Sequence, residues 1–515
     1  MAGELLHHLL EHSAGRRPEA EALVQGDTTI CYGELERGAN RLARLLVARG
    51  IAAGDRVALL AHNARFYVEA YYGVLKSGAV VVPLNTAAPP SQLAQLLRHA
   101  EARVLLCGTS MLRHVVREPD VLAQLELLVT EGEVRLPALT ATLQVASAAQ
   151  ADLDASAPAI VRDAQELAAI VYTSGSTGAP LGACLSHANL VHNARAILDY
   201  LPMASSERAF VVLPFYYIYG TSILNSHIAA GAALVLENNF MFPQAALDHL
   251  EAEACTSFAG VPSTFAILLH RSNLAQRQLE HLRYVTQAGG AMSPALTREL
   301  MAALRGRALY VMYGATEAAG RLTYLPPQEL QRELGSIGRP IAGMQVHVLG
   351  TNGEELAPGE VGELVASGPS IMQGYWKAAD ETARVLDAHG LHTGDLGYRS
   401  HSGMLYVVGR SKDMIKSGAH RIAAREIEEA ILEHEAVHEV AVLGVPDAIL
   451  GEAIHAYVVP REAGFEVDTL RAFLSTRLAS YKIPGTLVCR ETLPKNDAGK
   501  ILKLRLREEL GLPTV

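Results

Sequence analysis

The chain has 515 residues, of which 50% are hydrophobic and 19% are charged, and its formal net charge is −10. This composition excludes a disordered chain, and five scattered cysteines without a CxxC pair argue against a disulfide scaffold or a zinc–cysteine cluster. Because Asp and Glu outnumber Lys and Arg by 54 to 44, general nucleic-acid binding is also disfavoured, although a nucleotide ligand is not.

The first residues lack the basic and apolar regions of a secretory signal peptide. No apolar run reaches the ~20 residues that span a bilayer. Together with the unpaired cysteines, which indicate a reducing compartment, these features predict a cytoplasmic protein without a membrane span.

The first hundred residues alternate between helical and strand-like patterns. Residues 22–25 and 28–32 flank Gly26 and Asp27 as the two strands of a hairpin. A repeated β-α-β pattern follows, with strands predicted at 56–60, 79–83 and 103–107 and helices at 67–76 and 92–99. A parallel sheet with helices on both faces is therefore the expected fold.

The middle and the end of the chain have different patterns. Residues 131–158 are rich in Ala, Thr and Ser, and we expect a surface connection that leads into a strand at 168–172. Strand patterns that follow one another at short spacing in 343–365 predict an antiparallel or barrel-like subdomain. After Arg410 the pattern resets and predicts a compact α+β unit with helices at 426–434 and 469–477 and strands at 437–445 and 454–459.

The strongest local motif is TSGSTGAPLG at residues 173–182, directly after an apolar strand. Small hydroxyl and glycine residues at this density let backbone N–H and side-chain O–H groups converge on phosphate oxygens. The spacing differs from the Walker A motif and the segment has no lysine, which disfavours a P-loop NTPase. A flexible surface loop is the alternative for this segment taken alone.

This loop resembles the phosphate loop of the adenylate-forming superfamily, which includes acyl-CoA synthetases, luciferases and peptide-synthetase adenylation domains. Further matches follow in the family's order: VLKSGAVVVPL (74–84), FAGVPST (258–264), QAGGAMS (287–293), VMYGATE (311–317), GEL (362–364), GYW (374–376), HTGD (392–395), GRSKDMIKSG (409–418) and LPKNDAGK (493–500). The resemblance implies an α/β fold: an adenylating domain at 1–409 with doubly wound sheets and a small β-barrel-like subdomain, a hinge at 410–412, and a mobile α+β lid domain at 413–515.

The resemblance implies an AMP-forming acid–thiol ligase that uses ATP, Mg²⁺ and CoA. Tyr313 would lie against adenine, Thr316 on the α-phosphate and Glu317 on Mg²⁺, while Asp395 and Arg410 would hold the ribose hydroxyls. The full set expected to bind ATP or AMP is Thr173, Ser174, Gly175, Ser176, Thr177, Gly178, Gly289, Gly290, Ala291, Tyr313, Gly314, Ala315, Thr316, Asp395 and Arg410.

Three expected residues belong to the C-terminal part. The resemblance implies that Lys500 enters the site and stabilises the charge that develops during adenylation, so Lys500, Thr316 and Glu317 are the expected catalytic residues. Lys412 occupies the hinge position. The loop around Gly418 would face the thiol arm, which implies a rotation of the small domain between the two half-reactions.

The substrate is expected to be an apolar fatty or aryl acid. Amino-acid-activating relatives usually carry an aspartate for the ammonium group, whereas residues 213–220 (LPFYYIYG) contain no carboxylate. Tyr217, Gly220 and Ala288 are the expected pocket residues, and Gly220 suggests space for a chain.

The chain departs from the family pattern at three places. Leu181 replaces the usual lysine of the phosphate loop, Tyr217 replaces a gating histidine, and Ala423-Ala424 replaces a common Ser-Pro. The first departure puts ATP handling in doubt, and the second concerns substrate size and gating. The third is expected to change only loop stiffness.

Several alternatives remain open. An acyl carrier protein could replace CoA as acceptor, since both present a phosphopantetheine arm. Leu181 favours a protein that mainly binds acyl-adenylate or converts it to a thioester, and a luciferase-like oxygenase is more remote. The HExxH match at 434–438 is not read as a zinc site, because a helix is predicted to end near its first histidine. His7, His8 and His12 are interpreted as exposed polar surface.

Overall fold

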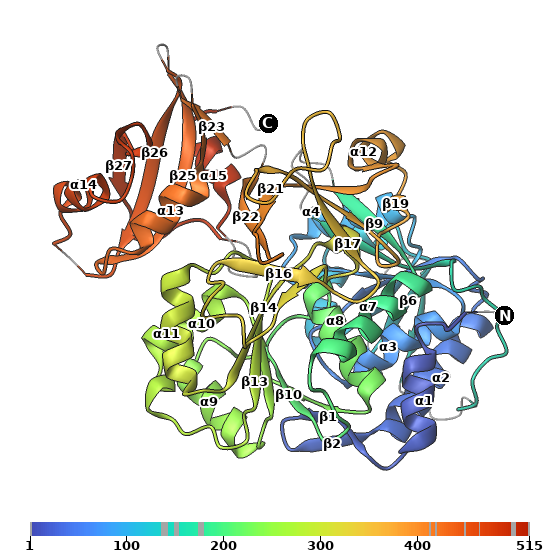
Figure 1. The fold of residues 1–515 in the computed structure, drawn as a ribbon. Coiled ribbons are helices and arrows are strands. Elements are labelled where there is room, and N and C mark those ends of the chain that lie inside the picture. Colours follow the sequence, from blue (N-terminus) through green and yellow to red (C-terminus); the bar gives the residue numbers. More distant parts are fainter. Residues whose placement is uncertain are drawn as a thin grey trace.

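The computed structural model describes residues 3–134, 143–148, 154–173, 180–410, 414–417, 420–447, 450–462, 464–495 and 501–512. Two large sheets and the helices around them form the main body, and the C-terminal elements form a lobe at its side (Figure 1). No helix among the described residues is long and apolar enough to cross a membrane.

The first sheet has eight strands in the order β19-β9-β8-β4-β3-β5-β6-β7. Its strands are β3 (Arg56–Leu60), β4 (Val80–Pro83), β5 (Val104–Cys107), β6 (Leu127–Thr130), β7 (Gln144–Ser147), β8 (Leu167–Thr173), β9 (Leu181–Ser186) and β19 (Gly374–Tyr375). The strands from β8 to β7 in this order are parallel, as the β-α-β pattern predicts, whereas β9 is antiparallel to β8 and to β19. The associated helices are α2 (Tyr32–Ala48), α3 (Arg65–Lys76), α4 (Pro90–Ala100), α5 (Leu112–Val116) and α6 (Pro119–Leu122).

One strand of this sheet differs from the sequence expectation. Residues 144–147 were expected to lie in a surface connection, but they form β7 and pair with β6 in parallel register. That prediction is wrong here because the pairing is with a strand already in place, which supplies hydrogen bonds that weak local periodicity does not reveal. Residues 135–142 and 149–153 of the same connection lie outside the described residues.

The second sheet has fourteen strands and runs β17-β18-β21-β22-β16-β15-β14-β13-β12-β10-β11-β1-β2, with β20 paired to β21. Its strands are β1 (Glu21–Gln25), β2 (Thr28–Cys31), β10 (Arg208–Val211), β11 (Ala233–Leu236), β12 (Ser257–Gly260), β13 (Tyr284–Gln287), β14 (Ala308–Tyr313), β15 (Thr323–Leu325), β16 (Ser336–Pro340), β17 (Gln345–Leu349), β18 (Gly362–Ser367), β20 (Leu386–Asp387), β21 (Gly390–Arg399) and β22 (Leu405–Arg410).

The second sheet changes character along its length. The strands from β1 to β14 in this order are parallel, and those from β14 to β17 are antiparallel. The antiparallel prediction for 343–365 is therefore confirmed. The helices that accompany this sheet are α1 (His8–Arg16), α7 (His187–Tyr200), α8 (Ile218–Ala230), α9 (Pro243–Ala252), α10 (Pro262–Arg271), α11 (Pro294–Leu304) and α12 (Ala379–Val385).

Helix α8 is buried around its whole circumference. Eleven of its thirteen residues are buried, and one continuous apolar cluster joins α8 to residues of both sheets. A helix that is buried on all sides is stable only inside such a core. Its carboxyl end is closed by Gly231, whose φ of +70° is the left-handed conformation that glycine adopts without strain. Figure 1 shows α7 and α8 between the two sheets.

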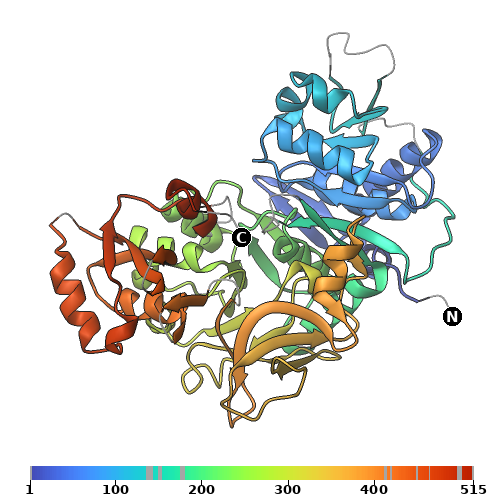
Figure 2. The same cartoon turned by 90° about the horizontal axis from the view of Figure 1, so that it is seen from above.

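Within the described residues, the C-terminal lobe is a five-stranded sheet with three helices. Its elements are β23 (Met414–Ser417), β24 (His420–Ala423), α13 (Ala424–Leu432), β25 (Val437–Asp447), β26 (Gly451–Pro460), α14 (Val467–Ser475), β27 (Thr486–Cys489) and α15 (Lys503–Glu509). The predicted α+β unit is confirmed, with its own apolar core around Ile427 and Leu470. The ring centroids of His270 in α10 and His438 in β25 lie 6.3 Å apart, and Figure 2 shows the lobe beside the main body.

Candidate active site

The candidate site is built where parallel strands end. The carboxyl ends of β12, β13 and β14 lie at one edge of the second sheet, because these strands pair in parallel register. The segments that follow β13 and β14 contain the QAGGAMS and VMYGATE motifs. Loops at the carboxyl ends of parallel strands are the usual place for a ligand in an open α/β sheet.

The glycine segment after β13 presents bare backbone. Ala288 is buried, whereas Gly289, Gly290 and Ala291 are exposed. Gly289 has a φ of +80°, and a Cβ atom there would lie 3.1 Å from Val261 Cγ1. Gln287 Nε2 donates to Gly290 O at 2.8 Å and fixes the turn. A ligand can therefore approach the backbone at this point, as expected from the sequence.

The loop after β14 carries Thr316 and Glu317 on a short 3-10 turn. Gly314 makes the turn possible, because a Cβ atom there would lie 2.2 Å from Gly320 O. Ala315 precedes the turn in extended conformation. Glu317 Oε1 accepts a hydrogen bond from Tyr375 Oη at 2.8 Å, so the carboxylate is held in place by the strand β19 of the other sheet. Burial, together with the Glu317 charge, raises the pKa of Tyr375, which keeps the phenol a donor.

Asp395 is the centre of the polar cluster. It is 6% exposed and lies on β21 opposite Arg410 of β22, whose Nε donates to Asp395 Oδ1 at 3.0 Å. Tyr313 Oη, at the end of β14, donates to Asp395 Oδ2 at 2.6 Å. Burial, and then the Asp395 charge, raises the pKa of Tyr313. Three residues that the sequence assigns to one nucleoside site are therefore brought together from three strands.

The phosphate loop lies only partly within the described residues. Ser174, Gly175, Ser176, Thr177 and Gly178 are outside them, whereas Thr173 is the last residue of β8. Thr173 pairs with Leu181, the first residue of β9, and its Oγ1 donates to Leu181 O at 3.4 Å. The antiparallel pair β8–β9 therefore holds both ends of the loop. Leu181 is half-buried at its base.

The predicted pocket residues lie at the start of α8. Tyr217 precedes the helix and is half-buried, with its ring centroid 4.6 Å from that of Tyr216. A Cβ atom on Gly220 would lie 2.0 Å from Pro214 O, so the close approach of backbone explains this glycine. Space for an acyl chain at Gly220 stays a prediction.

Lys412, Gly418 and Lys500 lie outside the described residues. The flanking geometry is defined: β22 ends at Arg410 in the second sheet, and β23 begins at Met414 in the sheet of the C-terminal lobe. Lys495 and Ile501 form an isolated antiparallel bridge on either side of 496–500.

The HExxH segment is not a helical zinc motif. Helix α13 ends at Leu432, and His438 lies in the strand β25. His434 Nδ1 instead accepts a hydrogen bond from Ala436 N at 3.3 Å. The interpretation made from the sequence is confirmed, since the two imidazoles do not share a helix face.

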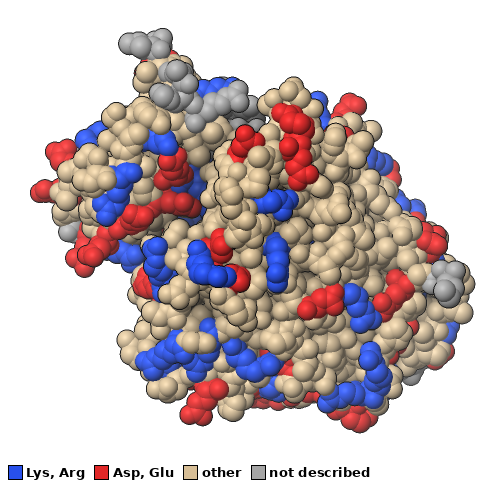
Figure 3. Space-filling view, viewed as in Figure 1, with Lys and Arg blue, Asp and Glu red and all other residues tan. Residues whose placement is uncertain are grey.

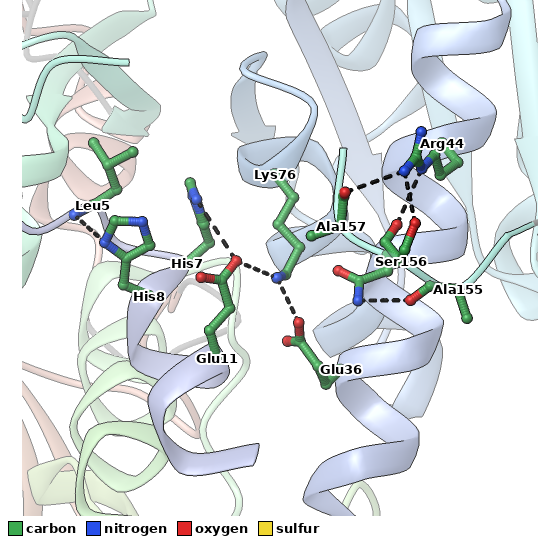
Figure 4. Close-up of polar contacts among 11 residues, drawn as sticks. Leu5, His7, His8, Glu11, Glu36, Arg44, Lys76, Ala155, Ser156 and Ala157 are labelled. Carbon is green, nitrogen blue, oxygen red and sulfur yellow. Dashed lines mark hydrogen bonds and ion pairs between the residues drawn. The ribbon is translucent and has the colours of Figure 1, made fainter. Parts of the chain in front are cut away.

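Within the described residues, one group of three potential metal ligands occurs: His7, His8 and Glu11 on and before α1 (Figure 4). His8 Nδ1 accepts a hydrogen bond from Leu5 N at 3.1 Å, so the ring proton is on its Nε2, which cannot ligate in this state. Lys76 Nζ lies 2.5 Å from Glu11 Oε1 and adds a positive charge beside the group. This arrangement disfavours a cation.

The same group instead ties helices together. Lys76 is 3% exposed and also contacts Glu36 Oε1 at 2.8 Å, which links α1, α2 and α3. His7 is buried, and this burial lowers its pKa to about 2, so its ring is neutral. The expectation of exposed polar surface is therefore wrong for His7, because α1 packs against the core. It holds for His12, whose side chain is 53% exposed.

Two residues of the site were not predicted. Tyr375 belongs to a motif quoted for the resemblance, but its contact with Glu317 spans 58 positions and has no local sequence pattern. Arg321 is 3% exposed and lies four positions after Glu317 in the sequence. An arginine in the otherwise apolar run AAGRL was a readable indication of a buried charge.

Surface charge does not single out another site on the face seen in Figure 3. Basic and acidic side chains are interspersed over it. Many charged side chains of the described residues form exposed ion pairs, such as Arg332–Glu329 and Arg477–Glu433. Exposed pairs of this kind are typical of a solvated surface. The buried polar groups at the strand ends therefore remain the main candidate.

The chain is similar to known proteins over almost its whole length. The protein-family model described as AMP-binding enzyme matches residues 10–376 of this chain. The family model described as AMP-binding enzyme C-terminal domain matches residues 426–500. A feruloyl-CoA synthase from Amycolatopsis sp is 35% identical over 500 residues, covering 96% of each chain. A long-chain-fatty-acid–CoA ligase from Bacillus subtilis (strain 168) is 32% identical over 536 residues, covering 99% of this chain and 95% of its own. ATP-bound MatB from Rhodopseudomonas palustris superposes with a TM-score of 0.87 at 28% identity, covering 98% of this chain and 99% of its own.

Proposed function

This chain belongs to the AMP-binding enzyme family as an AMP-forming ligase that uses ATP, Mg²⁺ and CoA, and we propose that the cluster at the carboxyl ends of β13 and β14 is its active site. The observation that carries the proposal is the convergence of Tyr313, Asp395 and Arg410 beside the anchored carboxylate of Glu317. Asp395 is buried and Glu317 half-buried, and pre-oriented carboxylate acceptors of this kind suit nucleoside hydroxyls and a phosphate-bound cation.

The reaction has two steps on one site. A carboxylate oxygen of the acid attacks the α-phosphorus of ATP, the bond to the β-phosphate breaks, and pyrophosphate leaves. The thiol of CoA then attacks the acyl carbon, and AMP leaves with the oxygen that joined it to the acid. Thr316 would contact the α-phosphate and Lys500 the oxygens on which charge develops.

Asp395 would accept from both ribose hydroxyls. Its two oxygens already accept from Tyr313 and Arg410, and each carboxylate oxygen retains further lone-pair capacity. These two contacts fix the carboxylate before a nucleotide arrives, which lowers the cost of ordering it. The exposed backbone at Gly289 and Gly290 would lie against adenine and the acyl group.

The residues present fit Mg²⁺ as the cation. Glu317 offers a hard carboxylate ligand held by Tyr375, and a single carboxylate with phosphate oxygens is a usual magnesium environment. When bound, Mg²⁺ supplies charge stabilisation of the phosphates. The protein's part is to hold Glu317 directed to that point through its hydrogen bond with Tyr375.

The two-domain arrangement suggests a moving part. We propose that 1–409 is the adenylating domain, 410–412 the hinge and 413–515 the lid, since the chain leaves one sheet at Arg410 and enters another at Met414. Lys412 would be the pivot. Lys500 would serve the first step and the loop at Gly418 the second.

We propose the chemical class of the acid, the acceptor and the location of the protein. The relatives named above include a feruloyl-CoA synthase and a long-chain-fatty-acid–CoA ligase, which supports an aryl or fatty acid. CoA is the acceptor, and a carrier protein is the alternative that parallel thioester assays would decide. A cytoplasmic location fits these substrates and the free cysteines.

Leu181 supports a second proposal about the balance of the two steps. It stands at the base of the phosphate loop where the family usually has a lysine, and it offers no charge to the β- and γ-phosphates. Acyl-adenylate carries neither phosphate. We therefore expect weakened use of ATP and normal thioester formation from preformed acyl-adenylate.

The test is acid-dependent exchange of labelled pyrophosphate into ATP by the full chain, with a panel of fatty and aryl acids. Exchange with at least one acid, lost in Glu317→Gln, is the expected result. Arg332→Gln, which breaks an exposed pair with Glu329, is the matched control and should keep the exchange. AMP binding without exchange from any acid would favour a non-catalytic binder, and light emission would favour an oxygenase.

A further inference from the structure

A small cavity lies deep between α7, α8 and the strands β10, β12 and β13, beneath the candidate site. Its volume is about 20 Å³, and its apolar walls include Ile223 and Phe258. A space of that size holds one water-sized group. Two residues that the reaction described above does not use, Arg321 and His227, line it as well.

Arg321 is a buried charge without an acidic partner. It is 3% exposed, and no carboxylate among the described residues lies within ion-pair distance of it. Its guanidinium carbon lies 4.0 Å from the ring centroid of Tyr219, Nη1 donates to Gly320 O at 3.4 Å, and the Tyr200 hydroxyl lies beside the guanidinium, but Nε has no hydrogen-bond partner. A cation–π contact offsets only part of the cost of burying such a group.

His227 supplies the opposite polarity. It lies on α8 and is 6% exposed, and its Nδ1 donates to Ile223 O at 2.8 Å. The ring is neutral because burial lowers its pKa, against smaller opposing effects of that hydrogen bond and of Glu207. Its Nε2 is therefore an acceptor, and it has no partner. The buried carboxylate of Glu207 pairs with Arg283.

The cavity is close to the point where an acyl group is expected. The Tyr219 ring lies against Arg321 on one face, and its Cδ1 is 3.7 Å from where a Cβ atom on Gly289 would stand. Tyr219 Oη donates to Thr286 O at 3.1 Å, and the end of an acid that enters the cavity has to displace this ring. One aromatic side chain therefore separates the exposed Gly289 backbone from the cavity.

We propose that this cavity receives a hydroxyl group at the far end of the acid, which accepts a hydrogen bond from Arg321 Nε and donates one to His227 Nε2. A hydroxyl is the single water-sized group that both donates and accepts. A second carboxylate would instead meet the lone pair of His227. The substrate class is then a hydroxy acid with an apolar body, an inference that rests on the proposed function.

The experiment compares matched acids on the full chain. Benzoate, 4-hydroxybenzoate and terephthalate, and cinnamate, 4-hydroxycinnamate and 4-carboxycinnamate, are assayed for acid-dependent pyrophosphate release with ATP and CoA. We expect kcat/KM for at least one hydroxy acid to exceed that of its parent by tenfold or more, since two buried polar groups stay unpaired with the parent.

Variants then assign the preference to the two residues. Arg321→Met and His227→Phe should each bring the ratio of hydroxy acid to parent acid close to one, whereas Arg321→Lys should keep part of it. Because the ratio is measured within one enzyme, a loss of folded protein does not change it. Arg277→Met is the matched control, since Arg277 is also buried but has Asp248 and Glu251 as partners. It should leave the ratio unchanged.

Each contrary result has one meaning. A preference for the parent or the dicarboxylate in every series, or a hydroxyl preference that survives Arg321→Met, overturns the inference. A ratio near one in the wild type with a lower Tm in Arg321→Met would make Arg321 a purely structural cation–π partner of Tyr219. Absence of pyrophosphate release with every acid would instead refute the proposed function.

Discussion

Replacement of Asp395 by asparagine tests the nucleoside site most sharply. The substitution keeps the shape of the side chain and removes its charge, at a position that is 6% exposed. A hydrogen bond to a charged group is worth ~1.5–3 kcal/mol and a neutral one ~0.5–1.5 kcal/mol, so two ribose hydroxyls lose roughly 2–3 kcal/mol together. This loss corresponds to a roughly 30- to 150-fold fall in kcat/KM for ATP.

The assay is acid-dependent AMP release over a titration of ATP and of 2′,3′-dideoxy-ATP. The dideoxy nucleotide lacks the same two hydroxyls, so the wild type should lose both charged hydrogen bonds with it, ~3–6 kcal/mol, which is more than Asp395→Asn loses with ATP. The two changes should then be strongly non-additive when combined. Additive losses would mean that Asp395 acts elsewhere.

Asp387→Asn is the matched control for the loss of one charge. Asp387 lies on β20 of the same antiparallel region and accepts from His392 Nε2 at 3.1 Å, away from Tyr313 and Arg410. Because exposed ion pairs contribute little free energy, this substitution should change kcat/KM for ATP by less than about twofold. An Asp395→Asn enzyme with a kcat/KM for ATP within this control range would refute the ribose assignment.

Three further substitutions address the moving parts and the phosphate loop. Lys500→Ala should slow adenylation far more than thioester formation from supplied acyl-adenylate, and equal losses in the two half-reactions would contradict this role. Lys412→Pro should restrict the hinge φ, leaving pyrophosphate exchange measurable while impairing thioester formation; two intact steps would place the pivot elsewhere. Leu181→Lys should improve pyrophosphate exchange and ATP KM by roughly tenfold through a charge-assisted hydrogen bond, and no gain over an already efficient parent would make Leu181 a tolerated variation.

Local patterns predicted most of the elements in the first hundred residues. The strand at 56–60 and the hairpin around Gly26 and Asp27 are present as expected, since apolar periodicity and turn residues determine them within a few positions. Strand β7 was missed because its stability comes from pairing with β6 and not from its own residues. His7 was misplaced for a similar reason: its burial depends on how α1 packs, which no short segment encodes.

The residues of the site also fall into those that the sequence indicated and those that it did not. The motifs placed Tyr313, Asp395 and Glu317 in one nucleotide site through the resemblance, and the fold does bring Tyr313 and Asp395 within 2.6 Å across 82 positions. The contact of Tyr375 with Glu317 depends on long-range packing, so sequence reasoning did not find it. The burial of Arg321 was indicated by the apolar residues around it but was not predicted. The sequence motifs therefore indicated the residues assigned to a ligand, but not the residues that hold them in place.

The central claim, that an acid is activated by transfer of AMP to its carboxylate, is tested most directly with an acid labelled with ¹⁸O in both carboxylate oxygens. The full chain is incubated with this acid, MgATP and CoA, and the AMP and acyl-CoA are analysed by mass spectrometry. The account predicts one ¹⁸O atom in each molecule of AMP formed and one in the acyl-CoA carbonyl. AMP without label, alongside labelled acyl-CoA, would contradict it, because the acid oxygen would then have left with another group.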